Sequence, residues 1–360
     1  MTAPAPPAAR SAARPRRRPA PLPVLVPALL AGLAVAVCFG VAVGTVTVPL
    51  DATVSVLASH LLPGRWGEFT VVQEQFVWEF RLPRVLLAAA VGAGLAVVGV
   101  LMQAVVRNPL ADPYVLGVSA GAGLGAVTVF VLVPAAAVGF PRYGASFAGA
   151  LVALAAVLVL ARERGRFTPR RVVLAGVTLS YLFTALTSFL IFRSDDPRAA
   201  NSVLFFLLGT LQDARWDNIA VAAAVVVGGL VVAQWYARPL NAFVVGDETA
   251  TALGYDVDRV RLVLLVTSAL VTGVLVAIAG GVGFVGLVVP HAVRFLVGSD
   301  HRRLLPVAAL ASAVYLVLVD VLCRVVVSPA ELPLGVVTAV LGAPYFLLLL
   351  RRNPRAKALS

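Results

Sequence analysis

The stretch VLLAAAVGAGLAVVGVLMQAVV, residues 85–106, contains 22 residues and no charge. A transmembrane helix needs about 20 predominantly apolar residues to cross the hydrocarbon core of a bilayer. Nine other segments approach this length and composition, although the seventh and eighth are short and nearly continuous, so a count of nine spans stays open. The ten candidate spans are residues 24–46, 85–106, 114–132, 144–161, 172–192, 219–236, 263–279, 282–297, 304–322 and 334–350.

The composition agrees with a membrane protein. Hydrophobic residues make up 60% of the chain and charged residues 13%, and the mean hydropathy is +0.96. An ordinary soluble domain carries roughly 25% charged residues. The apolar segments lack the two-residue alternation of a membrane barrel. We therefore predict an all-α integral membrane protein, a polytopic bundle of about ten transmembrane helices with both termini in the cytoplasm.

The net charge of +12 marks orientation rather than a nucleic-acid partner. With the N-terminus inside, 21 of the 29 Lys and Arg residues fall in cytoplasmic segments, as the positive-inside rule expects. Residues 1–22 are rich in Pro, Ala and Arg and are predicted to form a disordered basic cytoplasmic tail. A cleaved signal peptide is the alternative, but the apolar run after the tail exceeds a usual signal sequence. Residues 23–351 are predicted to form one domain and residues 352–360 a cytoplasmic C-terminal tail.

Several chemistries are excluded by what the sequence lacks. The only lysine is Lys357, so the chain has no phosphate-binding P-loop. GVSAGAGLGA, residues 117–126, has no βαβ context, and its glycines at intervals of four predict close helix packing instead. His, Met and Cys are few and scattered, with Cys38 and Cys323 in different spans, so no metal site is expected. We predict no catalytic residue, no bound cofactor and no enzymatic activity in this chain.

One carboxylate, Asp320, lies inside a predicted span. A carrier driven by an ion gradient usually keeps ionisable groups at membrane depth. However, Asp320 precedes Arg324 by four residues, which also fits a local ion pair on one helix. A secondary transporter is therefore the alternative function, with Asp320 as its candidate ion site.

Two features within the spans have both a structural and a functional interpretation. Ser180, Thr184, Thr187 and Ser188 fall at helical spacing on one side of the fifth span. Their hydroxyls either bond back to the helix backbone or line a wet passage. His291 follows Pro290 and is either a local polar group beside a kink or part of a transport path.

Two arginines, Arg81 and Arg84, lie at the predicted outer mouth of the second span. Arginine on the outer face runs against the topological preference, which suggests a specific use. Guanidinium groups recognise carboxylates through charge-assisted, often bidentate hydrogen bonds. The alternative is that the two side chains merely reach to the membrane interface.

The segment NAFVVGDETATALGYDVDRVR, residues 241–261, interrupts the apolar chain on the predicted cytoplasmic side. Gly246 breaks the chain, Asp247 is a good N-cap, and Gly254 suits the position after a helix end. Asp256 is then expected to cap the next span. Two short surface helices with Phe243, Val244, Val245, Leu253 and Tyr255 as apolar anchors would form a docking site for a partner. A solvated connecting loop is the alternative.

From Arg81 to Leu350 the chain resembles the iron-siderophore, haem and cobalamin permeases of type II ATP-binding-cassette importers. Five motifs in the family's order carry the resemblance. They are FRLPR, GVLMQAVVRNPLADPYVLGVSAGAGLGA, LNAFVVGDETATALGYDVDRVR, GFVGLVVPHAVRFLVGSDHRRLLP and ELPLGVVTAVLGAPYFLLLL. The long basic tail and the outer segment FFLLGTLQDARW, residues 205–216, depart from the usual pattern.

The resemblance implies a ten-helix subunit of the bacterial plasma membrane with several partners. These are a second permease copy, identical or not, two ATPase subunits that use ATP, and an extracytoplasmic substrate-binding protein. It implies translocation of a ferric siderophore or a related metal chelate, with cobalamin or haem as alternatives. The site residues it suggests are Gly246, Asp247, Glu248, Ala250, Leu253 and Gly254 for ATPase coupling, Arg81, Arg84 and Arg324 for binding-protein docking, and Ser180, Thr184, Thr187 and Ser188 for the translocation path.

Overall fold

The computed structural model describes residues 20–44, 48–64, 66–112, 114, 117–133, 139–163, 166–194 and 197–352. The N-terminal tail up to residue 19 and the C-terminal residues 353–360 lie outside this range. The first helix begins at Leu22, the last residue assigned to the tail, and the last helix ends at Arg352.

The described chain is almost entirely helical, as predicted. The elements, in chain order, are α1 (Leu22–Ala42), α2 (Leu50–Leu61), α3 (Val71–Glu74), the π-helix η1 (Gln75–Arg81), α4 (Leu82–Val105), α5 (Val118–Leu132), α6 (Gly139–Leu160), β1 (Arg162–Glu163), β2 (Arg166–Phe167), α7 (Pro169–Arg193), α8 (Pro197–Leu208), α9 (Trp216–Trp235), α10 (Ala237–Val245), α11 (Asp247–Ala252), α12 (Val257–Ala279), α13 (Val285–Val297), α14 (His301–Val325) and α15 (Leu334–Arg352).

Seven of these helical stretches are long and apolar enough to cross a membrane, and the one that contains α4 starts at Val71. The shorter apolar helices α5 and α13, together with α15, match the three remaining predicted spans. The seventh and eighth spans are separate helices, because residues 280–284 between Ala279 and Val285 are not helical. At about 1.5 Å per residue, the 13 residues of α13 extend about 20 Å, less than the roughly 30 Å hydrocarbon core.

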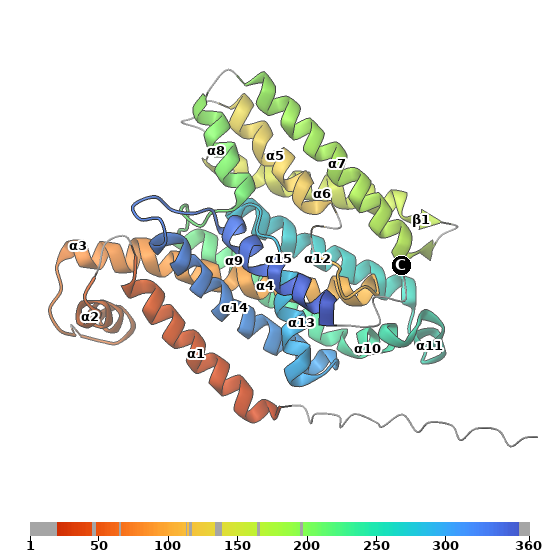
Figure 1. The fold of residues 1–360 in the computed structure, drawn as a ribbon, viewed down its shortest axis with the longest axis horizontal. Helices are drawn as coiled ribbons and strands as arrows, with labels where there is room; N and C mark the ends of the chain where they lie inside the picture. The colour runs from red at the N-terminus through yellow and green to blue at the C-terminus, as the bar shows by residue number, and fades with distance from the viewer. Residues whose placement is uncertain are drawn as a thin grey trace, which may run out of the picture.

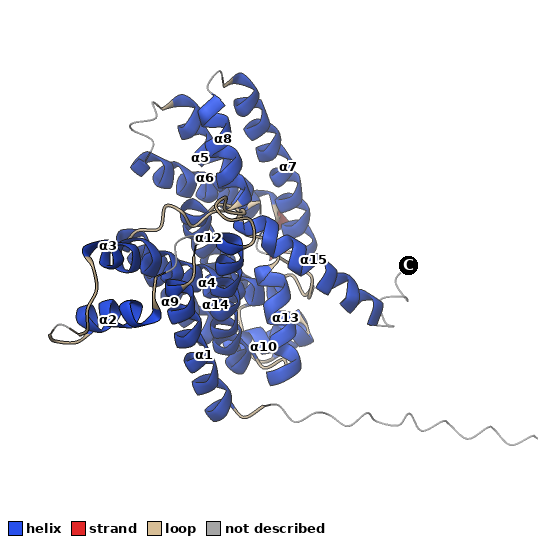
Figure 2. Ribbon diagram, turned by 60° about the vertical axis from the view of Figure 1, so that its left-hand side comes forward, coloured by secondary structure: helices blue, strands red, loops and turns tan. Residues whose placement is uncertain are grey.

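α4, which contains nearly all of residues 85–106, forms the centre of the bundle. Every residue from Gly94 to Val106 is buried, and α4 packs against α9, α12, α13 and α14. In Figure 1, α5, α6, α7 and α8 form a group to one side of this centre, and Figure 2 shows the same separation. An uncharged and almost wholly apolar sequence suits this position, because this part of the helix is buried on all sides.

The glycines of GVSAGAGLGA pack helices closely, as predicted. A Cβ atom added at Gly121 would lie 2.5 Å from the carbonyl oxygen of Gly149 on α6, and one at Gly125 would lie 2.0 Å from that of Ala145. Gly117 instead precedes α5 and lies against Gly176 of α7. The motif is therefore a packing surface for two neighbouring helices.

The two ends of the bundle differ. One end carries α10, α11 and the β1–β2 hairpin, and the opposite end carries α2 and α3 (Figure 1). Following the orientation expected from the basic residues, we call these the inner end and the outer end.

Candidate functional site

The inner end contains the two short helices that the sequence predicted. α10 ends at Gly246, whose φ of 152° disfavours other residues, and α11 follows directly. Leu253 is the C-cap of α11, and Gly254 has a φ of 84°, as the C′ position usually requires. Asp256 caps α12 by accepting a hydrogen bond from the Arg259 N–H at 3.0 Å. The local turn signals were therefore sufficient to divide this segment.

The predicted role of Asp247 was wrong. Gly246 is the N-cap of α11, and Asp247 occupies the first helical position without a capping bond. Its carboxylate instead accepts hydrogen bonds from the Arg261 guanidinium of α12, with N–O distances of 3.0 and 3.2 Å, and from Arg107 just beyond α4. Arg261, almost completely buried, also donates to the Phe167 carbonyl of β2. Asp247 thus ties α11 to two membrane helices.

The coupling segment has a buried side and an exposed side. Phe243 and Ala250 are buried in the core, whereas Val244, Val245 and Leu253 are exposed. Glu248 and Gly254 are also exposed, and Tyr255 is half-buried. Three of the five predicted apolar anchors are therefore exposed, whereas Phe243 holds α10 against the bundle.

A second set of contacts ties α10 to α14. The Asn241 side chain donates to Asp300 at 2.8 Å, and its carbonyl oxygen accepts from the His301 N–H at 3.0 Å. Burial alone would raise the pKa of Asp300, but the hydrogen bonds from Asn241 and the Arg302 N–H, with the charges of Arg302 and Arg303, lower it below its usual range. Asp300 therefore stays ionised at the start of α14, where it serves as the N-cap.

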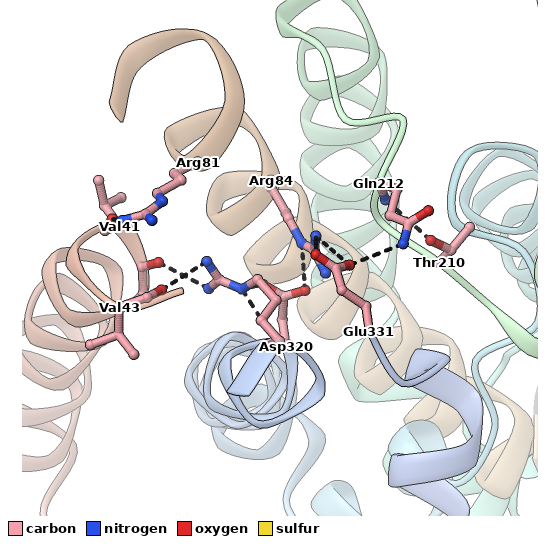
Figure 3. Close-up of polar contacts among 10 residues, drawn as sticks. Val41, Val43, Arg81, Arg84, Thr210, Gln212, Asp320 and Glu331 are labelled. Atoms are coloured by element: carbon pink, nitrogen blue, oxygen red, sulfur yellow. Dashed lines mark hydrogen bonds and ion pairs between the residues drawn. The ribbon is translucent and has the colours of Figure 1, made fainter. Parts of the chain in front are cut away.

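The outer end contains the three arginines of the predicted docking site. Arg324 shares the end of α1 with Arg81 and the Asp320 carboxylate with Arg84, and Figure 3 labels Arg81 and Arg84. Arg81 donates to the Val41 and Ala42 carbonyls at 2.9 Å each, and Arg324 donates to the Gly40 and Val43 carbonyls at 2.9 and 3.0 Å. The last carbonyls of a helix have no partner within it. Two arginines from other parts of the fold therefore supply the C-terminal bonds of α1.

Two carboxylates complete this outer network. Asp320 accepts from Arg84 at 2.8 Å and pairs with Arg324 at 3.1 Å. Glu331 accepts two bonds from Arg84 and one from Gln212 (Figure 3). The Asp320 side chain is 1% exposed, that of Arg84 13% and that of Glu331 21%. The network is thus a largely buried connection between α4, α14 and the segment before α15.

The three arginines do not form an exposed docking patch. Arg81 and Arg324 are buried, and only the pair of Arg84 and Glu331 reaches the surface to a useful extent. Arg81 and Arg324 satisfy carbonyls, which needs donors with several N–H groups at fixed angles. Docking by the arginines stays a prediction, and the ion pair expected between Asp320 and Arg324 is confirmed.

The sequence reasoning missed Glu331 and Gln212. Glu331 begins the motif ELPLG, and its charge just before an apolar span was the available signal. No sequence pattern indicated the role of Gln212, because it lies 119 positions from its partner Glu331.

The hydroxyls of α7 lie on one side of the helix but differ in burial. Ser180 donates to the Gly176 carbonyl at 2.8 Å, Thr187 to Phe183 at 2.8 Å and Ser188 to Thr184 at 3.0 Å. Thr187 is buried, whereas Thr184 and Ser188 are exposed and Ser180 is half-buried. The backbone-bonding interpretation therefore holds for three of the four, and the exposed ones still face away from the bundle.

A junction of three backbones lies near the end of α8. Thr210 N–H donates to the Ala279 carbonyl at 2.9 Å, Gly281 N–H to Phe206 at 3.2 Å, and Leu334 N–H to Gly209 at 2.9 Å. These bonds join the ends of α8 and α12 with the start of α15. The same segment continues into Gln212 and so connects to the outer charge network.

Comparison with known proteins places these features in a family. Residues 32–352 match the FecCD transport family. The cobalamin import system permease protein BtuC of Halobacterium salinarum is 41% identical over 333 residues, which cover 88% of each chain. The hemin transport system permease protein HmuU of Yersinia pestis is 42% identical, covering 80% of this chain and 87% of its own.

Two further similarities agree. The Fe(3+) dicitrate transport system permease protein FecD of Escherichia coli is 41% identical, covering 76% of this chain and 84% of its own. A solved structure of a metal-chelate type ABC transporter in an inward-facing conformation has a TM-score of 0.80 and 29% identity, covering 92% of this chain and 100% of that one. The chain therefore belongs to the FecCD transport family, the multi-pass permease subunits of type II ABC importers that carry metal chelates, haem, vitamin B12 or iron citrate.

Proposed function

We propose that this permease carries a ferric siderophore or a related metal chelate across a bacterial plasma membrane. It would pair with a second permease copy, two ATPase subunits and an extracytoplasmic binding protein. A chelated iron needs no ligands from the protein, so the path has only to be wide and weakly binding. Relatives named for cobalamin and haem transport make these substrates the second candidates.

The observation that carries the proposal is the construction of α11. Its exposed Leu253 is free to contact another chain, while Asp247 connects the helix to Arg107 beyond α4 and Arg261 on α12. A rigid displacement of α11 by an ATPase would therefore be passed to both membrane helices. Such a movement is the means by which ATP binding and hydrolysis would alternate access to the path.

A substitution in α11 tests this coupling. In proteoliposomes with the ATPase and binding protein, Leu253→Asp should lower substrate uptake at least tenfold while ATP hydrolysis continues. Leu253→Met, which keeps an apolar side chain of similar volume, is the control and should transport normally. Full uptake by Leu253→Asp would mean that α11 is only a solvated connection.

On the outer face, Arg84 is the proposed contact for an acidic residue of the binding protein. Its guanidinium is partly accessible and already arranged for a carboxylate, since it holds Glu331 by two bonds. We expect Arg84→Gln to weaken docking of the binding protein. Arg142→Gln is the matched control, because Arg142 is equally shielded and pairs with Asp213 in the same outer region. Equal losses in the two variants would remove Arg84 from the docking site.

The exposed side of α7 is the proposed lining of the path between two permease copies. Ser180, Thr184 and Ser188 are partly or fully exposed, and the large apolar side chains Tyr181 and Phe189 are exposed beside them. Thr187 faces the bundle and is not included. Cross-linking of cysteines placed at Thr184 in the two copies would support this arrangement, and its failure with an otherwise active transporter would refute it.

Substrate identity needs a direct assay. Reconstituted vesicles should be supplied from outside, in separate assays, with an ⁵⁵Fe-labelled siderophore, labelled cobalamin or haem, each with its own binding protein. ATP-dependent accumulation of the siderophore alone is the expected result, and accumulation of cobalamin or haem instead would reassign the substrate.

A further inference from the structure

A cavity of ≈ 250 Å³ lies at the inner end, beside the coupling helices. It is bordered by the end of α4, by α10, by α13 and by the start of α14. Its lining includes Arg107, Val244, His291, Arg294 and His301. The proposed transport mechanism makes no use of this cavity.

Every ionisable residue that lines the cavity is basic. Arg107 shares the Asp247 carboxylate with Arg261. Arg294 has no carboxylate within ion-pair distance in the part of the chain that the structure describes. Asp300, the nearby acid, is engaged by Asn241 and the start of α14 and does not line the cavity. A half-buried guanidinium without a counter-charge is costly, so the cavity favours an anion.

Two exposed apolar side chains border this basic cavity. Val244 of α10 lines it, and Phe295 of α13 packs edge-on against the lining residue His291, with ring centroids 5.2 Å apart; both are more than half exposed. The arrangement joins a cationic centre to an apolar rim at the predicted cytoplasmic boundary of the membrane. An apolar rim adds no favourable contact for a free inorganic ion, whereas the acyl chains of an amphiphile would pack against it.

We propose that the cavity binds the phosphate headgroup of an anionic phospholipid of the inner leaflet. Arg294 would hold the phosphate as the principal ion-pair partner, with Arg107 as a second cation and His291 as a further donor. His301 already bonds to the Asn241 side-chain oxygen through Nδ1. The acyl chains would lie along Phe295 and Val244. Basic pockets between transmembrane helices on the cytoplasmic side are suited to such headgroups.

The position of the site gives the lipid a structural consequence. Val244 belongs to α10, Arg107 pairs with the first residue of α11, and His301 bonds to Asn241 of α10. A bound lipid would therefore bridge the coupling helices and α13. This inference goes beyond transport itself, because lipid binding can be measured with the permease alone.

The test is a binding measurement on the purified full-length chain. Native mass spectrometry should be performed with phosphatidylglycerol, phosphatidylcholine and inorganic phosphate as separate probes. We expect the wild type to hold phosphatidylglycerol at least tenfold more tightly than phosphatidylcholine. Arg294→Gln should abolish that preference, and Arg294→Lys should keep part of it. Arg303→Gln, which removes an exposed arginine nine positions away and outside the cavity, is the matched control and should bind as the wild type does.

A second variant keeps the test informative if Arg294→Gln does not fold. Val244→Glu places a carboxylate in the cavity at an exposed position, so it should remove the preference for phosphatidylglycerol without disturbing the core. Equal binding of the two lipids by the wild type would overturn the proposal. So would an unchanged preference in both variants, or displacement of phosphatidylglycerol by inorganic phosphate at equal concentration.

Discussion

The charged networks at the two ends of the bundle are both built from two arginines around one aspartate, but the aspartates differ in burial. At the outer end, Arg84 and Arg324 surround Asp320, whose side chain is 1% exposed. At the inner end, Arg107 and Arg261 share Asp247, whose side chain is 39% exposed. The outer network connects segments that must stay together, whereas the inner one connects a surface helix to the membrane helices.

This difference in burial decides what each network contributes. Removing one member of a buried ion pair leaves its partner uncompensated and costs about 3–5 kcal/mol. An exposed pair contributes about 0–1 kcal/mol, because water replaces the lost partner. We therefore expect the outer network to contribute most to stability. The inner network, in which Asp247 is 39% exposed but Arg261 only 2%, should contribute less to stability while it transmits movement.

The largest effect is expected from Asp320→Asn. The change keeps the side-chain size but leaves Arg84 and Arg324 with less negative charge, so the free energy of unfolding should fall by about 3–5 kcal/mol. Unfolding of the purified chain in detergent measures it. Asp213→Asn is the control, since its partner Arg142 is shielded but Asp213 itself is 54% exposed, and it should cost at most about 1 kcal/mol. Similar losses in both variants would show that burial does not set the energy of the outer network.

An intermediate effect is expected from Glu331→Gln. Glu331 holds Arg84 and Gln212, but its side chain is 21% exposed, and glutamine keeps one acceptor. Loss of a hydrogen bond to a charged group costs about 1.5–3 kcal/mol, and partial solvation should bring the loss toward the lower value. The same unfolding measurement checks it. A loss as large as that of Asp320→Asn would contradict the graded burial of the two carboxylates.

The sequence was sufficient for the spans and for the ends of α11, and these have local causes. A bilayer requires long apolar segments, and Gly246, Gly254 and Asp256 act on their own neighbourhood. The partners of the charged residues were not predictable in the same way. Asp247 was assigned a capping role because Arg107, its partner, lies 140 positions earlier in the chain.

The outer arginines illustrate the same limit. The motif FRLPR indicates that Arg81 and Arg84 are specific, but not that Arg81 turns toward the carbonyls at the end of α1. That contact depends on how α1 packs beside α4 and α14, which composition does not encode. Asp320 and Arg324, four residues apart on one helix, were correctly paired because their spacing alone brings them together.

A smaller effect on stability, with a larger one on transport, is expected from Asp247→Asn. The free energy of unfolding should fall by about 1–1.5 kcal/mol, because water reaches the 39% exposed carboxylate but the buried Arg261 guanidinium loses its charged partner. Uptake per ATP hydrolysed should fall severalfold, since α11 loses its ion pairs with Arg107 and Arg261. Asp217→Asn is the control, as Asp217 is exposed in the first turn of α9, away from the coupling segment, and has no ion pair among the described residues. Equal coupling in both variants would exclude Asp247 as the connection.

The smallest effect is expected from Asp300→Asn, at the start of α14. Asparagine caps a helix about as well as aspartate, so the free energy of unfolding at pH 7 should change by no more than about 0.5 kcal/mol. The pKa of Asp300 is lowered in the folded chain, so its charge stabilises above the ordinary carboxyl pKa and loses that effect as the pH falls through the folded value. The difference between wild type and variant should therefore shrink from pH 5 toward pH 3 in thermal unfolding of the purified chain. A difference that persists at acid pH would mean that the Asn241 contact, rather than the charge, is what the inner end uses at this position.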